Sequence, residues 1–182
     1  MVWPDLTWVL SPIRWAVVGA VATRLYMPER MTQDLDIVIA VGDGSQARQK
    51  LLAAGFIHQG ELSIGGSSWI TPDGRQMDLL EGDDIWWRGA IVQAQTNRDA
   101  QGLPIVPLPY LALMKFQAGR AQDIADVTRM LGQAEAETLN AVRDAFAKYA
   151  PEDVDDLESL ITLGRLELQS MVYDASCVKR KT

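Results

Sequence analysis

Cysteine and histidine are almost missing from this sequence of 182 residues, which contains one of each, Cys177 and His58. A single cysteine cannot form an internal disulfide, which is typical of proteins from a reducing compartment. A single histidine without partners makes a Ser-His-Asp or Cys-His mechanism improbable. We therefore expect a cytoplasmic protein that does not use a nucleophilic triad.

Long apolar runs and clustered basic residues are also missing. No apolar run approaches the roughly 18 residues of a membrane-spanning helix, and Asp5 interrupts the apolar start, so no signal-peptide pattern is present. The net charge of -7 and the pI of about 4.7 argue against broad binding to a nucleic-acid backbone. The basic run at 179–181 is interpreted as a solvated tail. We expect no membrane partner.

The first half of the chain has the composition and pattern of a small α/β unit. Hydrophobic residues make up 48% of the sequence and charged residues 23%, as in ordinary globular proteins. Apolar runs at 14–19 and 34–41 predict buried strands. Gly19 separates the first strand from a short helix, and Ser45 is the predicted N-cap of a helix over 45–56.

Turn signals then predict a hairpin with its turn at 72–74, which returns the strand 75–80 to the sheet. The stretch 91–108 is mixed, with short strands expected around Gly102. From Pro109 onward the pattern is helical, and we expect helices over 109–118, 121–133, 135–149 and 152–170. The fold class is therefore α/β (α+β), with a small mixed sheet over 1–107 and a helical region over 108–182 packed on it. A leucine-rich stripe in the last helix is interpreted as core or a dimer face.

Two aspartates stand at the start of the second predicted strand. Asp34 and Asp36 are two residues apart, so in a strand they point to the same face, with their Cα atoms about 6.5 to 7 Å apart. Like charges this close repel, and a cation between them removes the repulsion. Oxygen ligands suit Mg²⁺ or Mn²⁺. The alternative is that acids at strand starts hold no ligand.

Two further features accompany this pair. Asp78 begins another apolar strand segment, and three carboxylates on adjacent strands are a common scaffold for two metal ions about 4 Å apart. Upstream, the order strand, Gly19, short helix is an arrangement in which a backbone can approach a phosphate closely. The alternative for Gly19 is an ordinary turn between a strand and a helix.

Together these segments resemble the nucleotidyltransferase fold of the DNA polymerase β-like superfamily. The matching stretch is VVGAVATRLYMPERMTQDLDIVIA, followed by RQMDLL. The finer pattern is similar to the small bacterial AbiEii-type nucleotidyltransferases, which show Arg-x-Thr-x-Asp-x-Asp, here Arg30, Thr32, Asp34 and Asp36. They also show a helical motif that KFQAGRAQDIADV matches with Lys115, Arg120, Asp123 and Asp126. The resemblance covers residues 16–40, 75–81 and 113–131.

The resemblance implies a metal-dependent transfer of a nucleoside monophosphate from an NTP such as ATP. The acceptor would be a protein, a small molecule or an RNA end, and the acidic net charge disfavours RNA. A toxin-like role is implied at family level, with an antitoxin or a second copy of the chain as partner. The resemblance implies Asp34, Asp36 and Asp78 as ligands of Mg²⁺ or Mn²⁺, with Asp78 also activating the acceptor hydroxyl. Gly19 and the Ala20 amide would approach the triphosphate, and Lys115 would neutralise phosphate charge. Arg30 and Thr32 would shape the pocket.

Alternatives stand beside several of these roles. Ala20 occupies a position where serine or a second glycine is usual, so the chain could be an inactive nucleotide- or protein-binding module of the same fold. Lys115 could be a surface lysine of an amphipathic helix. Arg120, Asp123 and Asp126 could pair on a solvated helix face, or Asp123 could cap its helix.

Overall fold

The computed structural model describes residues 2–29 and 31–178, with side chains described as far as Ser170. Arg30, the Cys177 side chain and the basic tail at 179–181 therefore lie outside the described part. The chain divides into two compact units, Met1–Pro107 and Leu108–Thr182.

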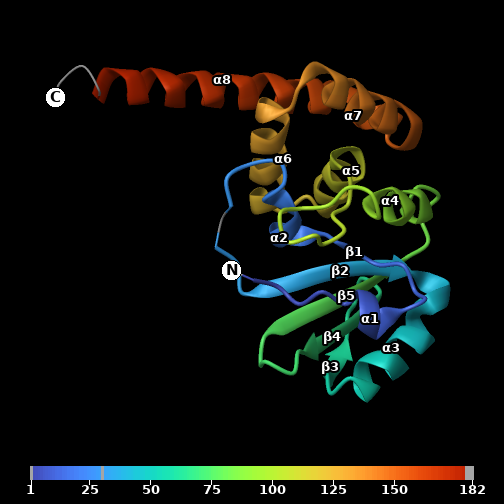
Figure 1. The fold of residues 1–182 in the computed structure, drawn as a ribbon. Coiled ribbons are helices and arrows are strands. Elements are labelled where there is room, and N and C mark those ends of the chain that lie inside the picture. The colour runs from blue at the N-terminus through green and yellow to red at the C-terminus, as the bar shows by residue number, and fades with distance from the viewer. Residues whose placement is uncertain (1, 30, 179–182) are drawn as a thin grey trace. The chain divides into compact units, whose positions relative to one another are not determined.

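The first unit is built on a five-stranded sheet in the order β1-β2-β5-β4-β3 (Figure 1). The central strands β2 and β5 run parallel, and every other neighbouring pair is antiparallel. The predicted mixed sheet and α/β class are confirmed. The strands are β1 (Ala16–Val17), β2 (Asp34–Ala40), β3 (Ile57–Glu61), β4 (Gly66–Ile70) and β5 (Gln76–Gly82).

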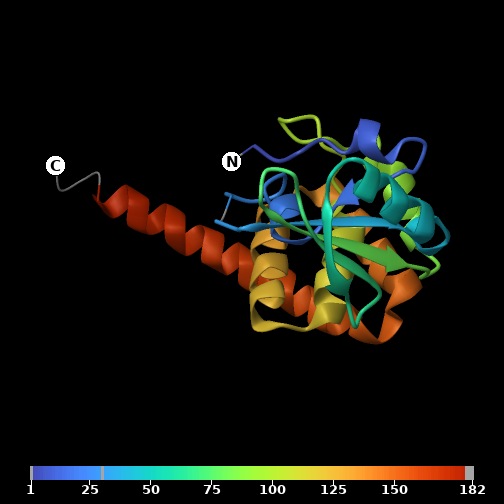
Figure 2. The same ribbon diagram turned by 90° about the horizontal axis from the view of Figure 1, so that it is seen from below.

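One face of this sheet forms the core of the first unit. Its side chains alternate with those of the other face, and the members with no exposed surface are Leu35, Ile37, Ile39, Trp69, Met77 and Leu79. Helices α1 (Thr7–Leu10) and α3 (Gly44–Ala53) lie on this side (Figures 1 and 2). Helices α2 (Gly19–Thr23) and α4 (Trp87–Ala94) lie on the opposite side, above the face that carries the aspartates.

Most local predictions in this unit hold, with four differences. The short strands expected around Gly102 are only isolated bridges, which join Val17 to Ile105 and Arg98 to Pro104. The predicted hairpin turn is confirmed, with Thr71 N donating to Arg75 O at 2.8 Å. The strand predicted over 14–19 is paired as a strand only at Ala16–Val17, with a bridge from Val17 to Ile105. Helix α3 begins at Gly44 after the 3₁₀ turn η1 (Val41–Asp43), so Ser45 is not its N-cap. Helix α4 lies partly in the stretch interpreted as mixed.

Helix α4 was not predicted from the sequence, and the reason is physical. It has eight residues, and an isolated helix of that length is not stable in water. Ala90, Ile91 and Ala94 are buried, and Trp87 Nε1 donates to Ile39 O at 2.8 Å. Its stability therefore comes from contacts with the sheet, which no local pattern reveals.

The second unit is helical. It contains α5 (Leu108–Ala118), α6 (Ala121–Gln133), α7 (Ala136–Tyr149), the 3₁₀ turn η2 (Pro151–Asp153) and α8 (Val154–Val178). These positions confirm the four predicted helices to within two residues at each start. Of the leucine-rich stripe, Leu157 and Ile161 are core, whereas Leu163, Leu166 and Leu168 are exposed. Within the described ranges, no helix is both long and apolar enough to cross a bilayer.

Candidate active site

The central feature of the site is the pairing of Asp36 with Asp78. These residues are opposite one another in the parallel register of β2 and β5. Neighbouring strands are about 4.8 Å apart, and residues in register point to the same face. Both side chains are half-buried. The pattern of two apolar strands, each led by an acid, therefore brings two carboxylates together on one face of the sheet.

Gly19 lies directly against this pair. Its φ of +63° is one that side-chain-bearing residues rarely adopt. A β-carbon built on it would come within 1.8 Å of Asp36 Oδ2. The preceding amide, Val18 N, donates to Asp36 O at 2.9 Å and ties the turn to β2. Position 19 thus requires glycine on two independent grounds, backbone conformation and space.

Asp34 lies on the same face, two residues before Asp36, and is half-buried. Its Oδ1 accepts a hydrogen bond of 2.5 Å from Thr32 Oγ1. Thr32 thereby orients one of the predicted metal ligands. Arg30, the other residue of the predicted motif, lies outside the described part of the chain.

The donor set of these aspartates suits a hard divalent cation. Carboxylate oxygens are the ligands that Mg²⁺ prefers, usually one or two together with water and substrate phosphate. In the described ranges, no group of three or more His, Cys, Asp or Glu side chains is placed to hold a metal ion. The in-register pair Asp36 and Asp78, with Asp34 beside it, therefore fits a site in which the substrate completes the coordination.

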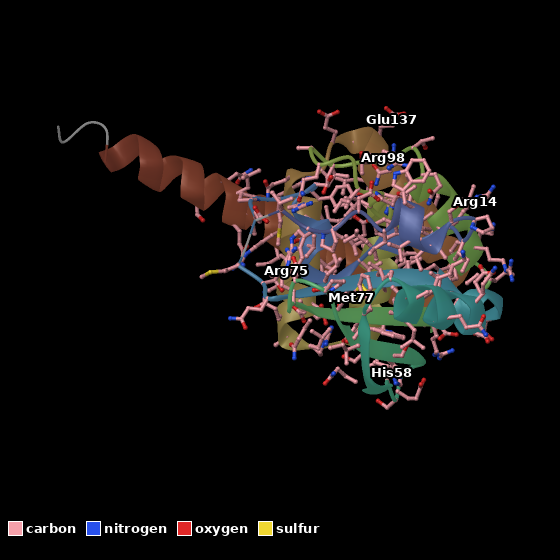
Figure 3. All side chains as sticks on the ribbon, turned by 60° about the horizontal axis from the view of Figure 1, so that its bottom comes forward. Arg14, His58, Arg75, Met77, Arg98 and Glu137 are labelled. Carbon is pink, nitrogen blue, oxygen red and sulfur yellow. The ribbon has the colours of Figure 1, made fainter. Side chains whose placement is uncertain are left out.

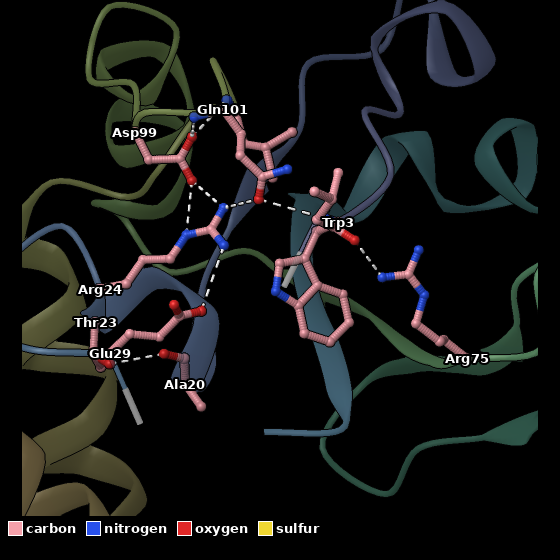
Figure 4. Close-up of polar contacts among 10 residues, drawn as sticks. Trp3, Ala20, Thr23, Arg24, Glu29, Arg75, Asp99 and Gln101 are labelled. Carbon is pink, nitrogen blue, oxygen red and sulfur yellow. Dashed lines mark hydrogen bonds and ion pairs between the residues drawn. The ribbon is translucent and has the colours of Figure 1, made fainter. Parts of the chain in front are cut away.

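Ala20 begins the packed part of α2. Its side chain is only 9% exposed, and its carbonyl accepts a 2.7 Å hydrogen bond from Thr23 Oγ1 (Figure 4). The carbonyl is therefore engaged inside the helix. The residue places a methyl group where the resemblance leads one to expect a hydroxyl.

A polar network holds α2 in place (Figure 4). Arg24, one residue past α2, donates from Nε to Asp99 Oδ2 at 2.9 Å and from Nη2 to Gln101 Oε1 at 2.7 Å. Gln101 Oε1 also accepts from Trp3 N at 3.4 Å. Asp99 is 75 residues from Arg24 in the sequence, so sequence reasoning missed this network. It ties the C-terminal end of α2 to the loop that contains Asp99 and Gln101.

Ser68 is a second residue that sequence reasoning missed. It is half-buried on β4 and in register with Asp78, so it extends the row Asp36–Asp78 across the same face. A signal for it existed. The hairpin turn at 72–74 pairs residues 70 with 76 and therefore 68 with 78, which can be counted from the turn alone.

Lys115, in the second unit, lies in a buried ion cluster. Its side chain is 5% exposed, and Nζ donates to Asp123 Oδ1 at 2.8 Å and to Asp126 Oδ2 at 2.9 Å. Gln122 donates to Asp126 at 2.9 Å, and Arg120 Nε donates to Asp123 at 2.5 Å. The alternatives of a surface lysine and of acids on a solvated face are therefore wrong. The nucleotide role of Lys115 stays a prediction.

The cluster also lowers the pKa of Asp123. Burial acts to raise the pKa of Asp123, but the hydrogen bonds from Lys115 and Arg120 outweigh it, so the pKa lies below its ordinary value. Asp123 is thus held as a carboxylate that balances the buried ammonium of Lys115. An uncompensated charge at this depth would be costly.

Comparison with known proteins adds a fold-level likeness. No protein-family model and no curated protein matches the chain. The solution structure of the antibiotic-resistance factor ANT(2'')-Ia aligns with a TM-score of 0.49 and 15% identity, over 90% of this chain and 88% of that chain. The crystal structure of ANT(2'')-Ia in complex with adenylyl-2''-tobramycin gives 0.42 and 14%, over 82% and 87%.

The crystal structure of the Cid1 poly(U) polymerase aligns with a TM-score of 0.37 and 19% identity, over 70% of this chain and 44% of that chain. All of these TM-scores are below 0.5. The likenesses therefore carry no conclusion about activity, and the function has to be inferred from the site itself.

Proposed function

We propose that this chain is a Mg²⁺-dependent nucleotidyltransferase that moves a nucleoside monophosphate from an NTP to an acceptor hydroxyl. The observation that supports it best is the register of Asp36 and Asp78 on one sheet face, with Gly19 packed against Asp36. Two carboxylates placed side by side on one sheet face are oxygen ligands of the kind that Mg²⁺ prefers. Glycine at position 19 lets the Asp36 carboxylate pack against the backbone of this turn, where a side chain would displace it.

A few residues would carry out the proposed reaction. Asp36 and Asp78 would hold Mg²⁺ together with the phosphates of the NTP, and Asp34 is proposed as a further ligand. The ion would neutralise charge on the triphosphate and on the departing pyrophosphate. The acceptor oxygen attacks the α-phosphorus, the bond from that phosphorus to the bridging oxygen breaks, and pyrophosphate leaves. Asp78 accepts the hydroxyl proton, either directly or through water.

The surrounding residues position these groups. Thr32 donates to Asp34 and limits the rotation of its carboxylate. Gly19 and the amide of Ala20 provide backbone for the triphosphate to approach. Arg30 is proposed to shape the pocket. Lys115 is proposed to neutralise phosphate charge, and two of its three ammonium hydrogens already engage Asp123 and Asp126.

The acceptor is proposed by class only. It is a protein, a small molecule or an RNA end, and the net charge of -7 disfavours RNA. A toxin or defence role, with an antitoxin or a second copy of the chain as partner, follows from the resemblance and stays a prediction.

A titration of a non-hydrolysable NTP by calorimetry, with and without Mg²⁺, tests the proposal. We expect Mg²⁺-dependent binding by the wild type and a loss of at least about tenfold in the double variant Asp34→Asn/Asp36→Asn, because each lost carboxylate removes a charge-assisted metal contact. The matched control Asp83→Asn/Asp84→Asn removes two exposed acids and should bind as the wild type does. Equal affinity in the wild type and the Asp34→Asn/Asp36→Asn variant would contradict the proposal.

A catalytically inactive nucleotide-binding or protein-binding module is the second candidate. Ala20 favours it, because its buried methyl group cannot donate a hydrogen bond to a phosphate. Pyrophosphate release distinguishes the two. NTP binding without release of pyrophosphate, across panels of proteins, small molecules and RNA ends, would favour the inactive module.

A further inference from the structure

A cavity of about 250 Å³ lies at the opposite end of the central strands from the aspartates. Three segments of the first unit line it: the residues before β1, the stretch from the end of β2 into α3, and α4. Its polar side chains are Arg14, Arg88, Asp43 and Gln46. The formal charge of this lining is therefore positive in a chain whose net charge is -7.

The sheet topology explains why these segments meet. Ala16 is in antiparallel register with Val38, so the residues just before β1, including Arg14, lie beside the residues that follow Val38. Strand β5 runs parallel to β2 and ends at Gly82 opposite Ala40, and the chain then enters α4 with Arg88. Figure 3 shows Arg14 beside α4 at this end of the unit.

The two arginines are unlike the other arginines that the structure describes in the first unit. Arg24, Arg48 and Arg75 form ion pairs with acids, and Arg98 donates to backbone carbonyls. Among the side chains that the structure describes, Arg14 and Arg88 make neither an ion pair nor a hydrogen bond. Two guanidinium groups that line one cavity and form no ion pair are available to bind an anion.

The cavity also has an apolar side. Ile13, which is 7% exposed, and Ile91, which is 3% exposed, contribute to the wall. The Arg88 head lies over the η1 turn, with Nη2 at 3.8 Å from the place of a Gly42 β-carbon. Guanidinium groups bind phosphate and carboxylate oxygens through paired N–H donors. The lining thus combines an oxyanion-binding pair with a surface for an apolar group.

We infer that this cavity is a second ligand site, which binds a small organic oxyanion, a phosphate or carboxylate that carries an apolar group. It is separate from the aspartates, because Ala40 follows Asp36 by four residues, about 13 Å along a strand. Asp43 and Gln46 accept hydrogen bonds from any hydroxyl or amine on the ligand. The anionic group lies between Arg14 and Arg88, and the apolar group lies against Ile13 and Ile91.

Titration of the 182-residue chain by ¹H–¹⁵N NMR with phenyl phosphate, and separately with benzoate, tests this inference and distinguishes phosphate from carboxylate. We expect saturable shifts confined to the amides of 13–14, 41–46 and 88–92. The Arg14→Gln/Arg88→Gln variant should bind at least about tenfold more weakly, because two charge-assisted contacts are lost. Both side chains are exposed, so this variant should keep its fold, and its spectrum shows whether it does.

Two controls make the outcome decisive. Arg165→Gln removes one exposed positive charge from the second unit and should leave the affinity unchanged. Asp34→Asn/Asp36→Asn should also keep it. Absence of binding of both probes to the wild type at about 10 mM, roughly ten times the concentration that half-saturates a millimolar site, or equal binding by the Arg14→Gln/Arg88→Gln variant, would overturn the inference. Shifts centred on residues 19, 36 and 78 would overturn it as well.

Discussion

Gly19 and Asp36 pack so closely that a β-carbon on Gly19 would come within 1.8 Å of Asp36 Oδ2. The two residues belong to separate elements, α2 and β2, and the hydrogen bond from Val18 N to Asp36 O holds these together. The carboxylate therefore owes its position to the absence of a side chain at residue 19. A side chain at residue 19 should therefore cost more than the backbone strain of a positive φ alone.

Gly19→Ala should destabilise the protein and abolish Mg²⁺-dependent NTP binding, because the new methyl group displaces the Asp36 carboxylate. Gly74→Ala is the matched control, since Gly74 has a φ of +85° but nothing within 4 Å of its β-carbon position. The control should cost only the conformational strain, about 1 kcal/mol. Urea denaturation and calorimetry measure both variants. If Gly19→Ala and Gly74→Ala lowered the free energy of unfolding equally and Gly19→Ala still bound NTP, the contact between Gly19 and Asp36 would have no role.

Thr32→Val should weaken NTP binding severalfold with little change in the free energy of unfolding. The substitution conserves shape but removes the hydroxyl that donates to Asp34 Oδ1 at 2.5 Å, a contribution of about 1 kcal/mol or somewhat more because the acceptor is charged. Thr32→Ser keeps the donor and should stay close to wild type. If Thr32→Ser were as impaired as Thr32→Val, the hydroxyl would not be the relevant group.

Lys115→Met should destabilise the protein by about 3 to 5 kcal/mol, because it removes the buried cation that Asp123 and Asp126 share and leaves Asp123 only its contact with Arg120. Asp123 is 4% exposed and Asp126 is fully buried. Lys148→Met is the control, since that ammonium is exposed above the Tyr149 ring and should cost about 1 kcal/mol or less. Urea denaturation at neutral pH measures both. A similar loss in the free energy of unfolding for Lys115→Met and Lys148→Met would contradict a structural role for the cluster.

The pH dependence of stability should report the same cluster. The folded pKa of Asp123 lies below its unfolded value, so its contribution is present above the unfolded pKa and is lost as pH falls through the folded pKa. We therefore expect the wild type to lose stability on acidification from neutral pH to below the ordinary range of aspartate. Glu158, whose pKa is lowered by Arg143, contributes in the same direction.

Lys115→Met separates the two contributions. It removes a hydrogen bond that lowers the pKa of Asp123 but leaves the pair Arg143 and Glu158 intact. Denaturation midpoints measured over the acid range should therefore fall less steeply in Lys115→Met than in the wild type. Parallel curves would show that Asp123 does not carry the acid sensitivity.

Local patterns predicted much of what surrounds the site. Strand periodicity put Asp34 and Asp36 on one face, and the turn at 72–74 set the register of β4 and β5, including the unrecognised pairing of Ser68 with Asp78. The helices of the second unit were predicted because their apolar spacing recurs over several turns. Such features depend on neighbours within a few residues, so the sequence contains them directly.

Contacts across long separations had no such signal. The burial of Lys115 follows from two helices packing around it, although α5 itself has no polar face that would distinguish a buried lysine from an exposed one. The bond from Arg24 to Asp99 spans 75 residues, and α4 is stabilised by the sheet beneath it.

By itself the sequence determined the acids, their spacing along one strand and the glycine before them, because strand and turn geometry are local properties. Tertiary structure alone decided that Asp78 stands opposite Asp36, that Gly19 touches the Asp36 carboxylate, and that Arg14 and Arg88 share a cavity. The order and direction in which strands pair decide these juxtapositions, and that pairing depends on burial summed over the whole unit.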